Sequence, residues 1–284
     1  DGCDRFKRIF NHRNGRICIF EAFNIKAMDY FLICLVAFLG SGLTLFSGFG
    51  LGTLLVPVFG FFFPIEMAIL LTAIVHFLNN IFKLFLLGQK ANKQALLAFG
   101  IPAILFAFVG AYLLSFLNTA QPIGSYTLGS HTFTLLPIKL CIGFILLFFA
   151  LFEIIPSWSQ LTFDKKYLPL GGVLSGFFGG LSGMQGALRA AFLIRAGLTK
   201  ESYIGTGVVI ACLIDLSRMG VYVQNWSQNA ENIAYPLVIC ATLSAFLGAF
   251  IGNRLLEKVT LKSIQLLVAL LLMVFAVLLG LGIL

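Results

Sequence analysis

A stripe of polar side chains interrupts a long apolar stretch that ends near residue 90. Asn79, Asn80 and Lys83 follow His76 by three, four and seven residues, so His76, one asparagine and Lys83 share a face of a helix. An imidazole, an amide and an ammonium group together suit anion binding or proton relay. Two other readings stay open, in which His76 is a hydrogen-bonded core residue and Lys83 extends to the membrane surface.

A second group of candidates surrounds Arg189, which follows the break Gly183-Met-Gln-Gly186. A helix N-terminus carries free N–H groups and partial positive charge, and a guanidinium beside it suits an anion with two or three oxygens. We therefore expect Gly183, Gln185, Gly186 and Arg189 to contribute to an anion site. The alternative is that Arg189 forms a structural ion pair with Asp215.

Asp215 and Arg218 lie three residues apart and therefore share a face of their helix. Either they neutralise each other within the helix, or Asp215 carries a proton or balances Arg189 while Arg218 joins the site. Thr72 and Thr206 are candidates whose hydroxyls could bind substrate or only their own helix backbone. Charged residues near the predicted helix ends are explained by extension to the surface; they are Glu66, Lys139, Glu153, Arg195 and Arg254.

The first of the elements that must position these groups is broken by glycines. Tyr30 to Ile65 is a run of 36 uncharged residues, and one helix of that length would measure about 54 Å against a hydrocarbon core of roughly 30 Å. Gly48, Gly50 and Gly52 each cost about 1 kcal/mol inside a helix, so we expect the break there. Unwound backbone at membrane depth lines a cavity or is buried in protein, which makes these glycines binding-site candidates; close helix packing is the alternative.

Composition predicts an integral membrane protein. Of the 284 residues, 60% are hydrophobic and 11% are charged, whereas a soluble domain carries about 25% charged residues. The net charge is +8, but six of the 19 Lys and Arg precede residue 28 and most others lie at helix ends. That distribution is the positive-inside pattern and requires no nucleic-acid partner. The six cysteines have no CxxC or metal-like spacing, so we expect no disulfide framework, no metal and no cofactor.

Hydrophobic runs predict two sets of four elements joined by a polar link. The first set is a broken element over 28–60 and helices over 66–88, 94–117 and 134–155; the second is a broken element over 168–198 and helices over 201–223, 232–253 and 262–284. The resulting divisions are a basic arm (1–27), a first transmembrane repeat (28–155), a cytoplasmic linker (156–167) and a second repeat (168–284). An offset of 134 residues places Gly52 on Gly186 and Thr72 on Thr206, which indicates an internal repeat.

Loop charges predict how these elements are oriented. Lys90, Lys93, Lys165 and Lys166 assign their loops to the cytoplasm, whereas 118–133 and 223–231 contain no Lys or Arg and are expected outside. The second broken element then starts and ends inside, as a re-entrant hairpin bent at Gly179-Gly-Leu-Ser-Gly183. The expected fold class is an all-α polytopic membrane protein of two inverted four-element repeats with about eight transmembrane elements, an architecture of secondary transporters. One conflict stays open, because symmetry assigns the basic arm to the outside.

Two signatures in register resemble the sulfite exporter (TauE/SafE) family. The first is Ser47-Gly-Phe-Gly-Leu-Gly-Thr-Leu-Leu-Val-Pro57, followed by a helix with Ala68 and Thr72. The second is Leu174-Ser-Gly-Phe-Phe-Gly-Gly-Leu-Ser-Gly183, followed by Leu188-Arg-Ala-Ala-Phe192, Gly197-Leu-Thr and Gly205-Thr206. Met184-Gln185 and Ala191 depart from the family pattern. The resemblance covers about 28–284 and implies an eight-element inner- or plasma-membrane transporter of sulfite, sulfonates or related small anions. The particular anion, the direction of transport and a coupling proton or other ion are left open.

Other functions are weaker alternatives. A passive anion channel could use the same positive half-helix ends. Gly180-Leu-Ser-Gly183 has the form found in intramembrane serine proteases, but His76 precedes Ser182, whereas in those proteases the histidine follows the serine. No zinc-protease, Walker or dinucleotide motif occurs, so no ATP-driven machine or enzyme is expected.

Overall fold

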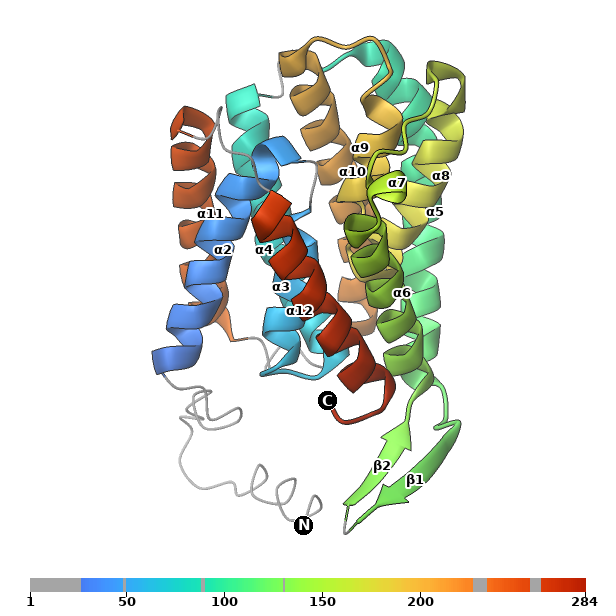
Figure 1. The fold of residues 1–284 in the computed structure, drawn as a ribbon. Coiled ribbons are helices and arrows are strands. Elements are labelled where there is room, and N and C mark those ends of the chain that lie inside the picture. The colour runs from blue at the N-terminus through green and yellow to red at the C-terminus, as the bar shows by residue number, and fades with distance from the viewer. Residues whose placement is uncertain (1–26, 48–49, 88–89, 130, 227–233, 256–261) are drawn as a thin grey trace.

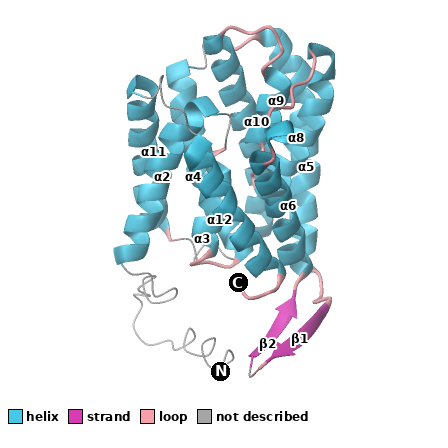
Figure 2. Cartoon of the chain, viewed as in Figure 1, coloured by secondary structure: helices cyan, strands magenta, loops and turns pink. Residues whose placement is uncertain are grey.

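The computed structural model describes residues 27–47, 50–87, 90–129, 131–226, 234–255 and 262–284. Residues 1–26 of the expected basic arm and the candidate Gly48 lie outside this part of the chain. The described part is a helical bundle with one small β-hairpin (Figures 1 and 2). In chain order the elements are α2 (Ala27–Ser47), α3 (Leu51–Gly60), α4 (Ile65–Leu87), α5 (Lys93–Thr119), β1 (Gly124–Leu128), β2 (His131–Leu135), α6 (Pro137–Ile154), α7 (Pro156–Ser159), η3 (Lys165–Tyr167), α8 (Leu168–Ser182), α9 (Gly186–Leu193), α10 (Lys200–Trp226), α11 (Tyr235–Leu255) and α12 (Lys262–Gly280).

The predicted helices are confirmed, with ends that differ by a few residues. Six helices of the described chain are long and apolar enough to cross a membrane, and both expected breaks occur, between α2 and α3 and between α8 and α9. The second break is later than predicted, because α8 continues through Gly179 to Ser182 and turns at Gly183. The hairpin β1–β2 was not predicted; it lies where the sequence indicated a loop.

Each broken element doubles back on itself (Figure 1). The chain runs up α2 and returns down α3, and it runs down α8 and returns up α9. The starts of α5, α8 and α10 lie at one end of the bundle, together with the loop cations Lys90, Lys93, Lys165, Lys166, Arg195 and Lys200. The β-hairpin, the start of α2 and the C-terminus lie at the other end. We call these the lysine-rich end and the hairpin end.

Glycines allow α8 to pack directly on the backbone of α5. A Cβ added to Gly172, Gly176 or Gly180 would lie 2.1–2.2 Å from the carbonyl oxygens of Phe99, Ala103 and Ala107. The helices therefore touch along a stripe of small residues, as in other membrane bundles. For these three glycines close packing is the correct explanation.

The same kind of contact joins α2, in the first half of the chain, to α11, in the second half. A Cβ on Gly248 would lie 2.0 Å from the carbonyl oxygen of Phe38, and one on Gly252 would lie 2.7 Å from the Cα of Gly42. Helices α6 and α12 pack antiparallel, with Gly143 against Ala276 and the Gly280 backbone. Each broken element thus packs on a helix of the opposite half, and this interleaving brings the two breaks together.

Candidate functional site

The two chain breaks cross in the interior of the bundle. Gly50 packs against the backbone of Gly186, and a Cβ on Gly52 would lie only 2.8 Å from the carbonyl oxygen of Gly183. Gly50, Gly52, Gly183 and Gly186 are all buried. Because Gly52 lacks a Cβ, the first break approaches the Gly183 carbonyl more closely than a larger residue would permit.

Local hydrogen bonds fix the shape of each break. Gly183 adopts φ +80°, a left-handed conformation that favours glycine, and its N–H donates to the Gly179 carbonyl at 2.9 Å to end α8. The Ser175 hydroxyl donates to the Gln185 carbonyl at 3.1 Å. In the first break, the Thr53 hydroxyl donates to the Gly50 carbonyl. Neither α3 nor α9 has a side-chain N-cap among the described residues. The Thr53 N–H donates to the Gly50 carbonyl, but the N–H groups of these first turns that make no backbone bond face no side-chain acceptor there.

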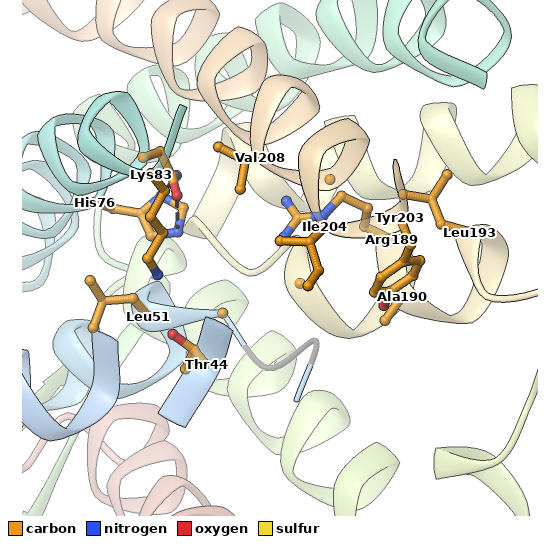
Figure 3. Close-up of a pocket in the computed structure, with 14 residues that line it drawn as sticks. Thr44, Leu51, His76, Lys83, Arg189, Ala190, Leu193, Tyr203, Ile204 and Val208 are labelled. Carbon is orange, nitrogen blue, oxygen red and sulfur yellow. Dashed lines mark hydrogen bonds between the residues drawn. The ribbon is translucent and has the colours of Figure 1, made fainter. Parts of the chain in front are cut away.

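A cavity of about 50 Å³ opens beside the crossing (Figure 3). Its described lining comes from α2, the N-termini of α3 and α9, α4 and α10: Thr44, Gly50, Leu51, His76, Asn80, Lys83, Gly186, Arg189, Ala190, Leu193, Tyr203, Ile204, Gly207 and Val208. One water molecule requires roughly 10–15 Å³ measured in this way. The cavity therefore has room for a small oxyanion or a few water molecules.

Two cations face this cavity from opposite sides (Figure 3). Lys83 is only 5% exposed, and its Nζ lies 3.3 Å from the Ser41 carbonyl. Arg189 donates from Nη1 to the Gln185 side-chain oxygen at 3.1 Å. Neither forms an ion pair with a described residue, and the described part of the lining contains no carboxylate. Lys83 is thus buried beside the cavity and does not extend to the surface.

A buried polar cluster lies below the cavity, on the side away from the lysine-rich end. Asp215 Oδ2 accepts from His76 Nδ1 at 2.7 Å and from Asn80 at 2.9 Å. Asp215 Oδ1 accepts from Arg218 Nε at 3.0 Å, and Arg218 Nη2 lies 2.8 Å away. Asp215 and Arg218 are 0% exposed and His76 is 4% exposed. The carboxylate is satisfied on both oxygens, so its charge is balanced locally.

This cluster shows which cation pairs with Asp215, whereas a role for Asp215 as a proton carrier stays a prediction. The suggested ion pair between Asp215 and Arg189 is wrong, because Asp215 binds Arg218 and His76 instead. Gln185 stands between them: its Nε2 lies 3.5 Å from Asp215, and its oxygen binds Arg189. Arg189 therefore keeps its charge uncompensated at the cavity.

Several predicted site residues lie near the cavity without lining it. Asn79 points to Ser41, whose hydroxyl lies 3.0 Å from the amide. Thr206 accepts from the backbone N–H of Asn92 at 2.8 Å, which ties the α4–α5 connection to α10. Thr72 is fully buried near Gly52, and its hydroxyl has no hydrogen-bond partner in the described chain. Gly52, Gly183, Asp215 and Arg218 support the cavity from below or behind.

Sequence reasoning missed two contributions from the first turns of α10. Tyr203 lines the cavity beside Arg189, and a Cβ on Gly207 would lie 3.4 Å from Arg189 Nε. The spacing of four residues between Tyr203 and Gly207 was a signal that they share a helix face. Nothing in the sequence indicated that this face would meet Arg189.

The protease alternative gains no support from the geometry. The Ser182 hydroxyl donates to the Phe178 carbonyl at 2.9 Å, and His76 is engaged with Asp215. No hydrogen bond joins Ser182 to His76 among the described residues.

A polytopic helical bundle with a cationic internal cavity is typical of membrane transporters of small anions. A family model described as Sulfite exporter TauE/SafE matches residues 33–279. The chain belongs to this family of membrane transporters for sulfite or related anions, and it is an integral membrane protein. No curated protein and no solved structure matches the chain.

Proposed function

We propose that the cavity between α4, α9 and α10 binds sulfite, or a related small oxyanion, as cargo for transport across the membrane. The observation that carries this proposal is the pair Lys83 and Arg189, which face one cavity whose described lining contains no carboxylate. Buried cations without a counter-ion are costly in a membrane protein. An anion between them offsets that cost and recovers the charge-assisted hydrogen bonds of both groups.

The backbone adds to the attraction for an anion. Gly50, Leu51 and Gly186 bring the N-terminal ends of α3 and α9 to the cavity wall. Both ends carry partial positive charge and free N–H groups. The volume of about 50 Å³ favours sulfite or a short sulfonate over an anion with a bulky organic group.

We further propose that the two halves are inverted repeats that provide alternating access. The halves exchange equivalent contacts, with α2 on α11 and α8 on α5. Their breaks also cross reciprocally, Gly50 with Gly186 and Gly52 with Gly183. A rocking motion of one half against the other would then leave the crossing near its centre while the two ends open in turn.

The arrangement supports loading from the lysine-rich end. The cavity lining includes the last turns of α4 and the first turns of α10, which lie at that end. The positive-inside rule assigns the lysine-rich end to the cytoplasm. On the other side the buried, hydrogen-bonded cluster of His76, Asp215 and Arg218 occupies the interior of the bundle. Loading from the cytoplasm agrees with export. A cavity with such a cluster on its opposite side favours a carrier over an open channel.

The direct test is equilibrium binding of sulfite to the purified protein, followed by flux in proteoliposomes. We expect saturable binding that is weakened by at least about tenfold in both Lys83→Met and Arg189→Gln, and flux that saturates at turnover far below channel rates. Flux that rises linearly with concentration would favour the channel. Unchanged binding in both variants would place the anion elsewhere.

A further inference from the structure

A second, smaller cavity lies across the crossing from the anion cavity. It measures about 10 Å³ and is lined by Gly50, Thr53, Phe149, Glu153, Met184, Gly186, Ala187 and Leu272. Gly50 and Gly186 line both cavities. A wall of two glycine residues therefore separates the cations of the first cavity from the contents of the second.

Glu153 is the single titratable side chain in the described lining of this second cavity. The groups that face it from α3, α9 and α12 are uncharged, among them Thr53, Ala187 and Leu272. Glu153 forms no hydrogen bond or ion pair with any described residue. Glu153 is partly buried, and withdrawing a carboxylate from water without a partner favours its protonated form.

Glu153, expected to extend to the membrane surface, is only partly exposed one residue before the end of α6 and lines this interior cavity. Phe149, one turn before Glu153, packs edge-to-face on Phe178, which lies near the end of α8. Glu153 itself is level with the crossing, since it lines a cavity with Gly50 and Gly186. After α7 the chain continues toward the lysine-rich end, where Lys165 donates a hydrogen bond to Gln94 near the start of α5.

We propose that Glu153 is the group that carries a coupling proton, and that the protein moves the anion and this proton together. This inference rests on the proposed function. An anion between Lys83 and Arg189 repels a carboxylate across the Gly50–Gly186 wall, so anion binding favours the protonated acid. By linkage, protonation of Glu153 favours anion binding by the same factor.

The proton balance of the cycle is simple. The Glu153 carboxylate takes one proton from water on the side to which the site is open and forms a carboxylic acid. When the site opens to the other side, the anion leaves and the acid returns its proton to water there. No other bond forms or breaks.

The test uses the purified full chain in proteoliposomes with labelled sulfite and a trapped pH-sensitive dye. In wild type we expect sulfite exchange at equal pH, net uptake driven by an inward proton gradient, and proton movement that accompanies uptake. Glu153→Gln mimics the protonated acid. The rate of sulfite exchange in this variant should stay within about twofold of wild type. The rate of gradient-driven uptake should fall by at least about tenfold, and one proton fewer should move with each sulfite.

Glu66→Gln, a change of the same chemistry at the start of α4, is the matched control and should behave like wild type. If Glu153→Gln does not fold, Glu153→Asp replaces it; it keeps a carboxyl group and should retain coupling with a shifted pH dependence. Gradient-driven uptake by Glu153→Gln at the wild-type level would overturn the proposal. So would loss of exchange in a variant that still folds and binds sulfite. Wild type that exchanges sulfite without proton movement overturns only this inference, whereas wild type that neither binds nor exchanges sulfite overturns the proposed function.

Discussion

At the scale of single residues, the cavity places two cations where the membrane disfavours them. Lys83 donates to the Ser41 carbonyl oxygen and Arg189 donates to the Gln185 side-chain oxygen, and both acceptors are neutral. These partners orient the cations without neutralising them. Function and stability are therefore expected to oppose each other at these positions.

Replacing Arg189 with Gln should weaken sulfite binding by about tenfold to a hundredfold, because a charge-assisted hydrogen bond contributes about 1.5–3 kcal/mol. Arg189→Lys should recover little, since a point charge does not reproduce the planar fork. Isothermal titration calorimetry on variants whose thermal unfolding matches wild type measures this. Arg195→Gln, an exposed change six residues later, serves as the control. If Arg189→Gln binds as tightly as the parent, Arg189 does not contact the anion.

Lys83→Met should separate binding from stability. The variant removes a 5%-exposed ammonium that pairs with no carboxylate in the described part of the chain, and replaces it with a side chain of similar length. Sulfite affinity is expected to fall by at least about tenfold, while the unfolding temperature without ligand stays the same or rises. Differential scanning fluorimetry with and without sulfite reports both effects. A large fall in unfolding temperature would show that Lys83 is a structural residue.

Asp215→Asn should be far more damaging to the fold than either cavity variant. It leaves Arg218 fully buried without its counter-ion, a change that costs about 3–5 kcal/mol. The double variant Asp215→Asn/Arg218→Met removes both charges and should regain much of the lost stability. Chemical unfolding in detergent of the single and double variants measures the coupling. Equal stability of Asp215→Asn and wild type would show that the pair does not hold the floor of the cavity.

At the scale of the elements, the contact of α8 with α5 offers a direct test of close packing. Gly176→Ala adds a Cβ 2.2 Å from the Ala103 carbonyl oxygen, so α8 must move away, at a cost of about 1–3 kcal/mol. Gly220→Ala on α10 is the control, because nothing lies within 4 Å of its added Cβ. That control should be neutral or up to about 1 kcal/mol more stable. Thermal unfolding should therefore occur at a lower temperature in Gly176→Ala, and at the same or a higher temperature in Gly220→Ala, than in wild type.

Much of the element order was predictable because it depends on local sequence. Lengths of uncharged runs located the helices, and the alternating glycines before Leu51 located the first break. The hairpin 124–135 was missed, although Ser125 to Leu128 and Thr132 to Leu135 alternate in polarity around Gly129. The polar loop composition was taken as the absence of regular structure.

The candidate site was less predictable because it depends on which elements cross. The stripe on α4 correctly grouped His76, Asn80 and Lys83, which follows from helical periodicity alone. The partner of Asp215 and the depth of Glu153 depend on how α4, α6 and α10 pack, and no local pattern encodes that. The glycines of α8 show the same limit, since spacing alone does not distinguish a packing glycine such as Gly176 from a break glycine such as Gly183.

At the scale of the whole molecule, charge is distributed unevenly between the two ends. The connections before α5, α8 and α10 carry the loop cations, whereas the opposite end carries the hairpin β1–β2 and the C-terminus (Figure 1). The anion cavity lies toward the lysine-rich end. The orientation of the protein in the membrane therefore determines which side loads the anion, and the proposed direction of transport depends on it.

Cysteine labelling in intact cells tests that orientation. In a variant whose six native cysteines are replaced by serine, Gly129→Cys at the tip of the hairpin should react with an impermeant thiol reagent. Asp164→Cys, in the connection before η3, should react only after the membrane is permeabilised. Both positions are exposed in the structure, so burial does not explain a difference between them. The opposite labelling would place the lysine-rich end outside, against the positive-inside rule, and the cavity would then load from outside and serve uptake instead of export.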